Sequence, residues 1–376
     1  MSEPFDAALA RATRAVQTCA HEFGTDFPGD CTLAGRYRHR PGAAGLPDGA
    51  NLGWTTGFRT GMLWLCAQVT GQERFADAAS ADVASFAARL RDGVELDTHD
   101  LGFLYSLSCV NAWLLTRDAA ARQVGLAAAD RLLTRVVEPA GIIQAWGSLD
   151  DPAQRGRAIV DSLMNLPLLY WASQTSGDPR YAHAATRHAR QLRDHIVRAD
   201  GTTYHTFFWD PGTGAPLRGA THQGHDDASC WARGQAWAIY GFALAHRHSG
   251  EQLFWETSKR CADAFWVRLP SDRVPYWDLV FTDGSSQPRD SSAGAIAACG
   301  LLELAIASPD ARSKAEALVT SLIDHCAAPA GSDALLLHGV YNLPGGEGID
   351  EATLWGDYFY LEALTRLTHP ACVLPW

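Results

Sequence analysis

Apolar residues recur at helical spacing along almost the whole chain. Positions that repeat every three to four residues predict roughly twelve helical segments, each long enough for several turns. The predicted segments span residues 5–22, 54–69, 74–91, 99–116, 118–136, 157–174, 178–198, 227–247, 250–267, 290–306, 309–327 and 350–367. This pattern indicates an all-α protein.

Short glycine-containing turns connect several of these segments. Gly71, Gly177 and Gly250 each follow the last apolar position of one segment, and an acid and an aromatic residue open the next. Glycine adopts the left-handed backbone that ends a helix without strain, and short connections make consecutive helices antiparallel neighbours. The predicted helices therefore pair as six hairpins of roughly 60 residues each.

One helix of each pair is unusually apolar, as in residues 103–115, 163–171, 231–244 and 293–306. A helix that is apolar on every side is buried, so these helices would form the inner ring of a closed chain. We therefore predict a single domain over residues 1–376 that folds as an (α/α)6 barrel. Strand-like pieces are predicted in rim loops at 202–209, 275–278 and 341–346.

Acidic residues gather at the predicted N-terminal ends of the inner helices. They are Asp100, Asp161, Asp226, Asp227, Asp290 and Asp350, with Asp357 one turn further on. An acid in a first turn is usually a cap or a partner of the helix dipole. Asp161 differs because it interrupts an apolar run, where burial would raise its pKa as a general acid near neutral pH requires. Asp100 opens another apolar helix about one repeat away, which predicts that both carboxyls share one mouth.

The chain carries a formal net charge of −11, which argues against a nucleic-acid partner. Its first residues show no basic-then-apolar signal, and no uncharged stretch reaches the roughly 18–20 apolar residues that span a membrane. Nine cysteines lie scattered without a C-x-x-C or zinc spacing. These features predict a cytoplasmic protein without a membrane partner, metal or cofactor.

Thirteen tryptophans are many for this length, and several lie near the proposed mouth. Those near the mouth are Trp54, Trp146, Trp231, Trp237 and Trp355. Aromatic faces stack on sugar rings, so this distribution favours a carbohydrate pocket, although core packing accounts for most of the thirteen.

The densest polar cluster spans residues 221–237. His222, His225 and Asp226 resemble metal ligands, but no fourth ligand has a recognisable spacing, which disfavours a metal site. Arg233 is interpreted as a partner for a carboxylate or a ring hydroxyl, with a plain structural ion pair as the alternative.

The segment 222–241 resembles the signature of the unsaturated glucuronyl hydrolases, glycoside hydrolase family 88. Supporting matches lie at 54–65, 99–103, 161, 165–169 and 355–358. The resemblance implies an (α/α)6 barrel that needs no cofactor. It also implies hydration of the C4=C5 double bond that polysaccharide lyases leave in a terminal 4,5-unsaturated uronic acid.

The resemblance assigns roles residue by residue. Asp161 matches the general acid/base that protonates C4 and assists water attack at C5, after which the hemiketal collapses and expels the remaining sugar. Asp100 matches a second acid that stays charged and helps to keep Asp161 protonated. The matching residues of the sugar subsite are Trp54, His99, Trp146, His205, Gln223, Trp231, Arg233, Trp237 and Tyr358.

Two segments, 110–112 and 368–372, are less typical of the family, which leaves aglycone and sulfate preference open. The related family 105 of unsaturated rhamnogalacturonyl hydrolases is one alternative, although Gln235-Ala236 favours the glucuronyl family. A sugar 2-epimerase that uses His205 and His222 is a second alternative. A carbohydrate-binding barrel without catalysis is the third. The expected oligomeric state is a monomer or a weak dimer.

Overall fold

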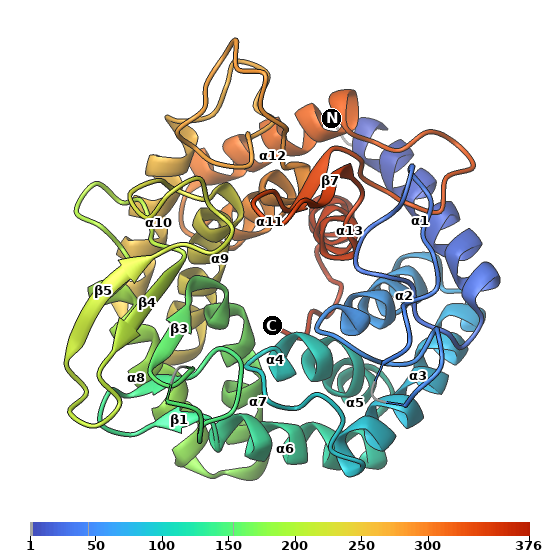
Figure 1. Cartoon of the computed structure of the whole chain (residues 1–376). Coiled ribbons are helices and arrows are strands. Elements are labelled where there is room, and N and C mark those ends of the chain that lie inside the picture. The colour runs from blue at the N-terminus through green and yellow to red at the C-terminus, as the bar shows by residue number, and fades with distance from the viewer. Residues whose placement is uncertain (1–2, 44, 153) are drawn as a thin grey trace.

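The computed structural model describes residues 3–43, 45–152 and 154–376, and its helices form two concentric rings (Figure 1). The inner ring consists of α2 (Thr56–Thr70), the run α4 (Leu101–Tyr105), η1 (Ser106–Val110) and α5 (Asn111–Thr116), the run η2 (Val160–Asn165) and α7 (Leu166–Ser176), α9 (Ala232–Ser249), α11 (Ser291–Leu304) and α13 (Leu354–Thr368). The outer ring consists of α1 (Glu3–Phe23), α3 (Glu73–Arg91), α6 (Ala119–Leu133), α8 (Pro179–His195), α10 (Gln252–Trp266) and α12 (Pro309–His325).

Outer and inner segments alternate along the chain, and α13 packs against α1 and α2 to close the ring. The predicted (α/α)6 barrel is therefore confirmed. Burial explains the two rings: α9 and α11 are buried along nearly their whole length, whereas α8 buries only one helical stripe. Gly71, Gly177 and Gly250 end their helices with left-handed φ values of 66°, 79° and 74°, as predicted.

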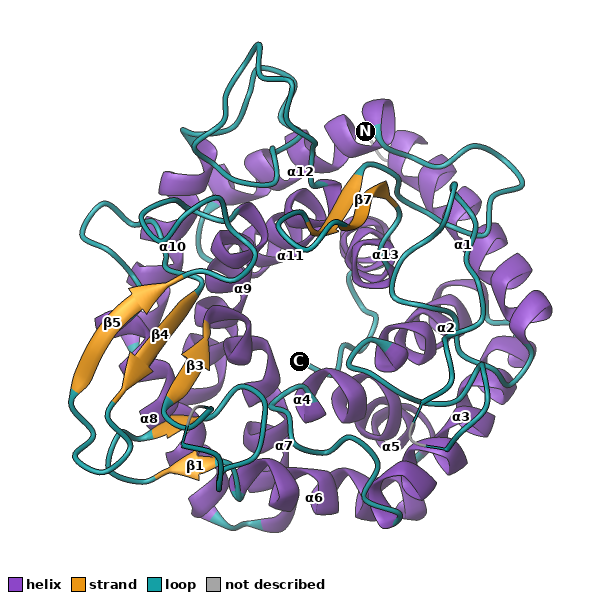
Figure 2. Ribbon diagram, in the orientation of Figure 1, coloured by secondary structure: helices purple, strands orange, loops and turns teal. Residues whose placement is uncertain are grey.

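In the described residues, three small antiparallel sheets lie at the rim, and their strands appear as orange arrows in Figure 2. Their strands are β1 (Val136–Val137), β2 (Ile142–Ile143), β3 (Arg157–Ile159), β4 (Thr206–Trp209), β5 (Pro216–Ala220), β6 (Gly339–Asn342) and β7 (Glu347–Glu351). The sheets have the orders β1-β2, β3-β4-β5 and β6-β7. The predicted rim pieces at 202–209 and 341–346 form parts of hairpins, and 275–278 forms isolated bridges.

The helix predicted over 157–174 is wrong in its first half. Residues 157–159 form β3, which pairs with β4, and 160–165 form the 3-10 helix η2. The α-helix begins only at Leu166, with Pro167 in its first turn. The β-branched pair Ile159-Val160 favours an extended backbone once β4 offers hydrogen bonds. The 99–116 helix is likewise interrupted, by the π-helical segment η1.

Two predicted helix starts were also placed too early. Helix α9 begins at Ala232, so Asp226 and Asp227 lie exposed in the preceding loop. Asp350 lies exposed on β7 with a left-handed φ of 60°, and not at a helix terminus. These three acids therefore do not join Asp100 and Asp161 at inner-helix ends.

The C-terminus lies inside the ring in the view of Figure 1. Trp376 is buried there, stacked on Phe359 at a centroid distance of 6.1 Å, and its Nε1 donates to Glu362 Oε2 at 2.7 Å. Phe103, which follows Asp100 on α4, meets the same indole edge-on at 6.3 Å. The last residues thus fill the barrel interior.

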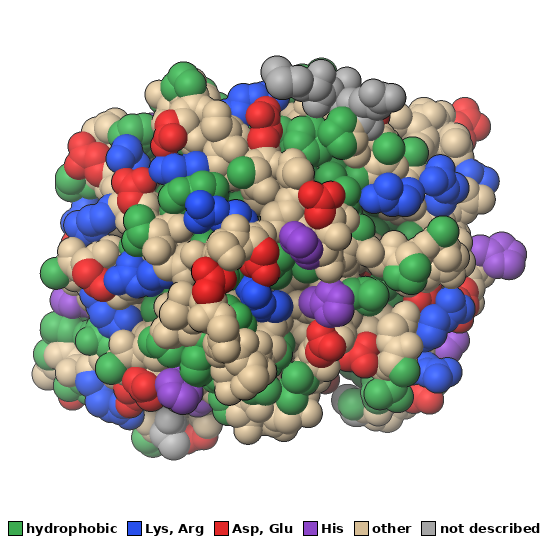
Figure 3. Space-filling model, turned by 90° about the horizontal axis from the view of Figure 1, so that it is seen from above, with side chains coloured by type: hydrophobic (Ala, Val, Ile, Leu, Met, Phe, Trp, Pro, Cys, Tyr) green, Lys and Arg blue, Asp and Glu red, His purple; other side chains and the backbone are tan. Residues whose placement is uncertain are grey.

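Acidic and basic side chains are intermingled on the side of the molecule shown in Figure 3. Every helix of the described chain is too short or too polar to cross a membrane.

Candidate active site

Asp100 and Asp161 lie at the N-terminal ends of two contacting inner-ring segments, α4 and η2. Their side chains keep 16% and 15% exposure, respectively. The fully buried His99 lies between them. Its Nε2 atom is 3.3 Å from Asp100 Oδ1 and 4.0 Å from Asp161 Oδ1. The structure therefore brings these three predicted residues together, with both carboxyls near the imidazole of His99.

Asp100 is held in its charged form. Burial raises the pKa of its carboxyl, but the charge of His99 and a 2.6 Å hydrogen bond from Thr98 Oγ1 outweigh burial, so the pKa is lowered. Burial lowers the pKa of His99, and the Asp100 charge outweighs it, so that pKa is raised. His99 and Asp100 therefore form an ion pair.

Asp161 has the opposite tendency. Burial raises the pKa of its carboxyl to about 7, the Asp100 charge acts in the same direction, and His99 and Arg233 oppose them. Its Oδ1 atom is buried and accepts no hydrogen bond from the described residues. This direction agrees with the one predicted from the apolar neighbours of Asp161. Asp161 can therefore donate a proton near neutral pH.

Asn165 ties the two acid-bearing segments together. Its Oδ1 atom accepts a hydrogen bond from the backbone N–H of Phe103 at 2.8 Å, joining the end of η2 to α4. The sequence interpretation used Asn165 only as part of a motif. The contact explains why an amide side chain occurs in an otherwise apolar stretch, since a buried N–H needs an acceptor.

Arg233 is buried, and both terminal nitrogens of its guanidinium donate to protein acceptors. Its guanidinium donates to Asp290 Oδ2 at 3.1 Å and to Tyr341 O at 2.6 Å. It lies 4.5 Å from the ring centroid of Trp231 and 4.9 Å from that of Trp355. Arg233 thus forms the structural ion pair that was the alternative interpretation, and it links α9 to β6.

His205 is a neutral hydrogen-bond donor. Its Nδ1 atom accepts from the backbone N–H groups of His222 and Gln223 at 3.0 and 3.3 Å, which places the ring proton on Nε2. Burial drives the pKa of His205 well below its ordinary value. The ring packs against Trp231 at 4.4 Å.

Tyr341 forms an aromatic wall with Trp54 and Trp355. The sequence did not predict Tyr341 as a site residue. Its hydroxyl accepts from Trp54 Nε1 at 3.1 Å, and its carbonyl accepts from Gln223 Nε2 at 3.0 Å. Trp54 also stacks on Trp355 at 5.0 Å. Only the strand-like rim loop at 341–346 hinted at this residue, because its partners lie far away in the sequence.

Trp146 is half-buried beside Asp100, since its backbone bridges to Thr98. The Arg157 guanidinium lies 3.9 Å from its ring centroid, and the His222 ring lies 5.2 Å away. Trp146 is therefore a half-covered aromatic surface at the mouth.

Trp237 and Tyr358 lie deeper, in the packed core. Trp237 packs on Phe103 at 5.4 Å and on Phe359 at 5.3 Å, and Tyr358 packs on Phe58 at 5.6 Å. Both are buried. Their contribution to a sugar subsite stays a prediction.

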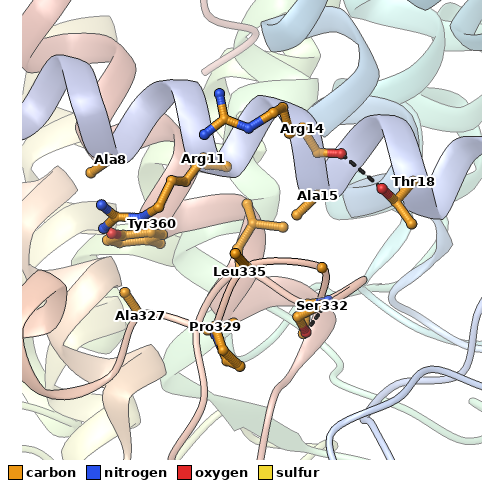
Figure 4. Close-up of a pocket in the computed structure, with 15 residues that line it drawn as sticks. Ala8, Arg11, Arg14, Ala15, Thr18, Ala327, Pro329, Ser332, Leu335 and Tyr360 are labelled. Carbon is orange, nitrogen blue, oxygen red and sulfur yellow. Dashed lines mark hydrogen bonds between the residues drawn. The ribbon is translucent and has the colours of Figure 1, made fainter.

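A cavity of about 260 Å³ opens beside Asp100. It is lined by Gly53, Trp54, Arg89, Glu95, Asp97, Thr98 and Asp100. Another cavity, of about 270 Å³, lies between α1 and the loop 327–335, where Arg11 and Tyr360 face each other (Figure 4). No predicted site residue lines this second cavity. Within the described part of the chain, no three His, Cys, Asp or Glu side chains are grouped to hold a metal ion.

Residues 34–340 match Glycosyl Hydrolase Family 88. The chain belongs to this family. It is 48% identical over 326 residues to the unsaturated glucuronyl hydrolase of Bacillus sp. (strain GL1), covering 84% of this chain and 86% of that protein. It is 42% identical over 370 residues to the unsaturated chondroitin disaccharide hydrolase of Streptococcus pneumoniae, covering 96% and 90%.

The barrel of this family 88 member is also similar to solved structures. It superimposes on the crystal structure of an unsaturated glucuronyl hydrolase from Streptococcus agalactiae with a TM-score of 0.94 and 38% identity, covering 100% of this chain and 94% of that one. The predicted family, barrel and unsaturated glucuronyl hydrolase class are confirmed. The match favours family 88 over the family 105 and epimerase alternatives.

Proposed function

We propose that this family 88 protein hydrates the C4=C5 double bond of a 4,5-unsaturated glucuronic acid at the non-reducing end of glycosaminoglycan fragments. One observation carries the proposal: the buried His99 Nε2 lies within 4.0 Å of two carboxyls whose pKa values are driven apart, as a proton donor and a charged partner require. The names of the Bacillus and Streptococcus pneumoniae relatives support the substrate class.

The reaction adds one water molecule across a vinyl ether. Asp161, protonated near neutral pH, donates its proton to C4, and its carboxylate then accepts a proton from the water that attacks C5. Asp100 stays ionised and stabilises the positive charge that develops at C5 and the ring oxygen. The resulting hemiketal opens, and the free C1 hemiacetal expels the remaining sugar. Because C5 and not C1 is attacked, the separation rule for retaining and inverting glycosidases does not apply.

The neighbouring residues are proposed to bind the uronate ring. His205 offers an Nε2–H donor that stays neutral, so it binds hydroxyl groups without disturbing the Asp161 proton. Trp54 keeps partial exposure and offers an aromatic face, whereas Trp231 is buried against His205 and Arg233 and supports them. Arg233, stacked on Trp231, supplies a positive field for the sugar carboxylate while its two terminal nitrogens stay bound within the protein.

The loss of ultraviolet absorbance tests this function. The conjugated double bond of lyase-derived disaccharides absorbs near the ultraviolet edge, and hydration abolishes that band. Unsaturated disaccharides from hyaluronan and chondroitin should lose the absorbance and release a monosaccharide, whereas pectin-derived ones should persist. Loss from the pectin fragments alone would indicate family 105 chemistry, and no loss from any substrate would refute hydration.

We further propose that the protein works in the reducing cytoplasm as a monomer or weak dimer. The nine free cysteines, most of them buried, support a reducing compartment.

A further inference from the structure

A buried chain of hydrogen bonds runs behind the proposed acid. Ser162 directly follows Asp161, and its Oγ atom lies 2.7 Å from Nε2 of His188 on the outer helix α8. The same hydroxyl donates to Ile159 O at 2.6 Å. His188 Nδ1 in turn accepts from the backbone N–H of Ile143 on β2 at 2.9 Å. Ser162 and His188 are both buried.

Hydrogen-bond chemistry fixes the direction of this chain. Because His188 Nδ1 accepts a backbone N–H, the single proton of the neutral ring lies on Nε2 and is donated to Ser162 Oγ. The Ser162 hydroxyl donates its own proton to the Ile159 carbonyl. Burial lowers the pKa of His188 to about 3, so the ring stays neutral at any pH at which the enzyme would work.

This polarity is opposite to that of a nucleophilic serine. A serine nucleophile gives its proton to the imidazole, whereas here the imidazole gives its proton to the serine. The Ser162 hydroxyl is also buried and cannot reach a substrate. The pair therefore acts on the protein backbone and takes no part in the bond chemistry.

These hydrogen bonds fix the turn from β3 into η2. On one side of Asp161, the N–H of Val160 donates to His205 O at 3.0 Å. On the other side, Ser162 is held by His188 and by the carbonyl of Ile159. The backbone is thus bound on both sides of Asp161, while the carboxyl itself stays 15% exposed.

We propose that the His188–Ser162 strut, meaning Ile143, His188, Ser162 and Ile159, positions Asp161 for proton transfer to the substrate. This inference rests on the proposed function. A loosened turn would move the carboxyl away from C4, and a shift of about 1 Å can cost roughly 100-fold in rate. It would also admit water to Asp161 and lower the pKa that burial raises.

The test compares S162A with S258A. Ser258 on α10 is a matched control because it is also a buried serine whose hydroxyl donates to a backbone carbonyl at 2.6 Å, that of Ile239 on α9. S162A should lower kcat about tenfold or more with KM nearly unchanged, and should move the alkaline limb of the kcat profile to lower pH. S258A should change neither. Wild-type kcat and an unmoved limb in S162A would overturn the proposal.

A second pair of variants tests the role of His188. A glutamine amide reaches the Nε2 position and can still donate to Ser162, whereas an asparagine amide reaches only the Nδ1 position. H188Q should therefore keep several-fold more kcat than H188N. Equal kcat values in two folded variants would argue against the strut.

A carboxyl titration separates this inference from the proposed function. The Asp161 resonance can be assigned in protein carrying ¹³C-carboxyl aspartate by comparison with D161N. If wild-type protein consumes no unsaturated disaccharide, the proposed function fails, yet the titration still tests the strut. A lower Asp161 pKa in S162A than in wild type supports the strut, and the same pKa in both contradicts it.

Discussion

Asp100 and Asp161 carry the same functional group, and their surroundings drive them to opposite protonation states. His99 forms an ion pair with Asp100 and Thr98 donates a hydrogen bond to it, so the Asp100 charge is compensated. Asp161 lies at the longer distance from His99 and has a buried oxygen that accepts no hydrogen bond from the described residues. Burial therefore dominates at Asp161 and compensation dominates at Asp100.

The sequence predicted the tendency of Asp161 because its neighbours in the chain are apolar. It also placed His99 in the motif, but not between the acids. The groups that stabilise the Asp100 charge and the amide of Asn165 act through side-chain geometry, which no spacing in the sequence encodes. Tyr341 was missed for the same reason, since its partners are Trp54 and Gln223.

At the scale of one residue, D161N should be more stable than wild type at high pH. Folding raises the pKa of Asp161 from 3.8 to about 7, so the folded state holds the proton more tightly than the unfolded chain. Wild-type stability therefore falls as pH rises from about 4 to about 7, by a few kcal/mol. Urea unfolding at pH 8 should show D161N to be the more stable protein, and the difference should shrink at pH 4.5.

The exposed Asp77 on α3 provides the control for this experiment. D77N should track wild type at both pH values. If D161N differs from wild type by the same free energy of unfolding at pH 4.5 and pH 8, folding does not raise the pKa of Asp161.

At the scale of elements, Arg233 joins the β6–β7 hairpin to the barrel. Arg233 on α9 binds backbone carbonyls of β6 and Asp290, which caps α11, and it stacks between Trp231 and Trp355. A single planar cation thus connects two inner helices, a rim hairpin and the aromatic wall.

R233K should therefore be a severe change. The lysine ammonium is a point charge without the planar fork, so it cannot keep both backbone contacts and the stacking. We expect KM for the unsaturated disaccharide to rise about tenfold or more, and amide exchange in 339–351 to accelerate. R312K, in an exposed pair with Glu316, should leave both unchanged. Wild-type KM and exchange in R233K would contradict this assignment.

Helical periodicity predicted the helices well and the segments that carry Asp161 and Asp350 poorly. Residues 157–165 have an apolar pattern that suits a helix, yet β4 offers them a strand partner. The π-helical residues 106–110 also have apolar residues at helical spacing. This spacing does not distinguish the hydrogen-bond pattern of a π-helix from that of an α-helix. Pairing with distant segments decides such cases.

At the scale of the whole molecule, the C-terminal residues of the protein fill part of the barrel interior. Trp376 stacks on Phe359 and meets Phe103 and Tyr358, and its Nε1 is bound by Glu362. Val373 is fixed to Gln68 of α2 by hydrogen bonds of 2.7 and 3.0 Å. The tail therefore joins several inner helices.

W376A should destabilise the barrel by roughly 3–5 kcal/mol, because it removes a large buried aromatic side chain. The urea midpoint measures the loss. V373A, on the exposed part of the same tail, should change stability by less than about 0.5 kcal/mol. Equal midpoints for the two variants would show that the indole does not support the interior.

The central claim is that a buried, protonated Asp161 beside a charged Asp100 hydrates the unsaturated uronate. The most direct measurement is the rate of ultraviolet absorbance loss from a chondroitin-derived unsaturated disaccharide, as a function of pH, for wild type and D161N. We predict that the wild-type kcat falls as pH rises through about 7, where Asp161 loses its proton, and that folded D161N loses about 100-fold or more of the activity. Turnover by D161N at the wild-type rate, or a wild-type kcat that stays constant up to pH 9, would contradict the claim.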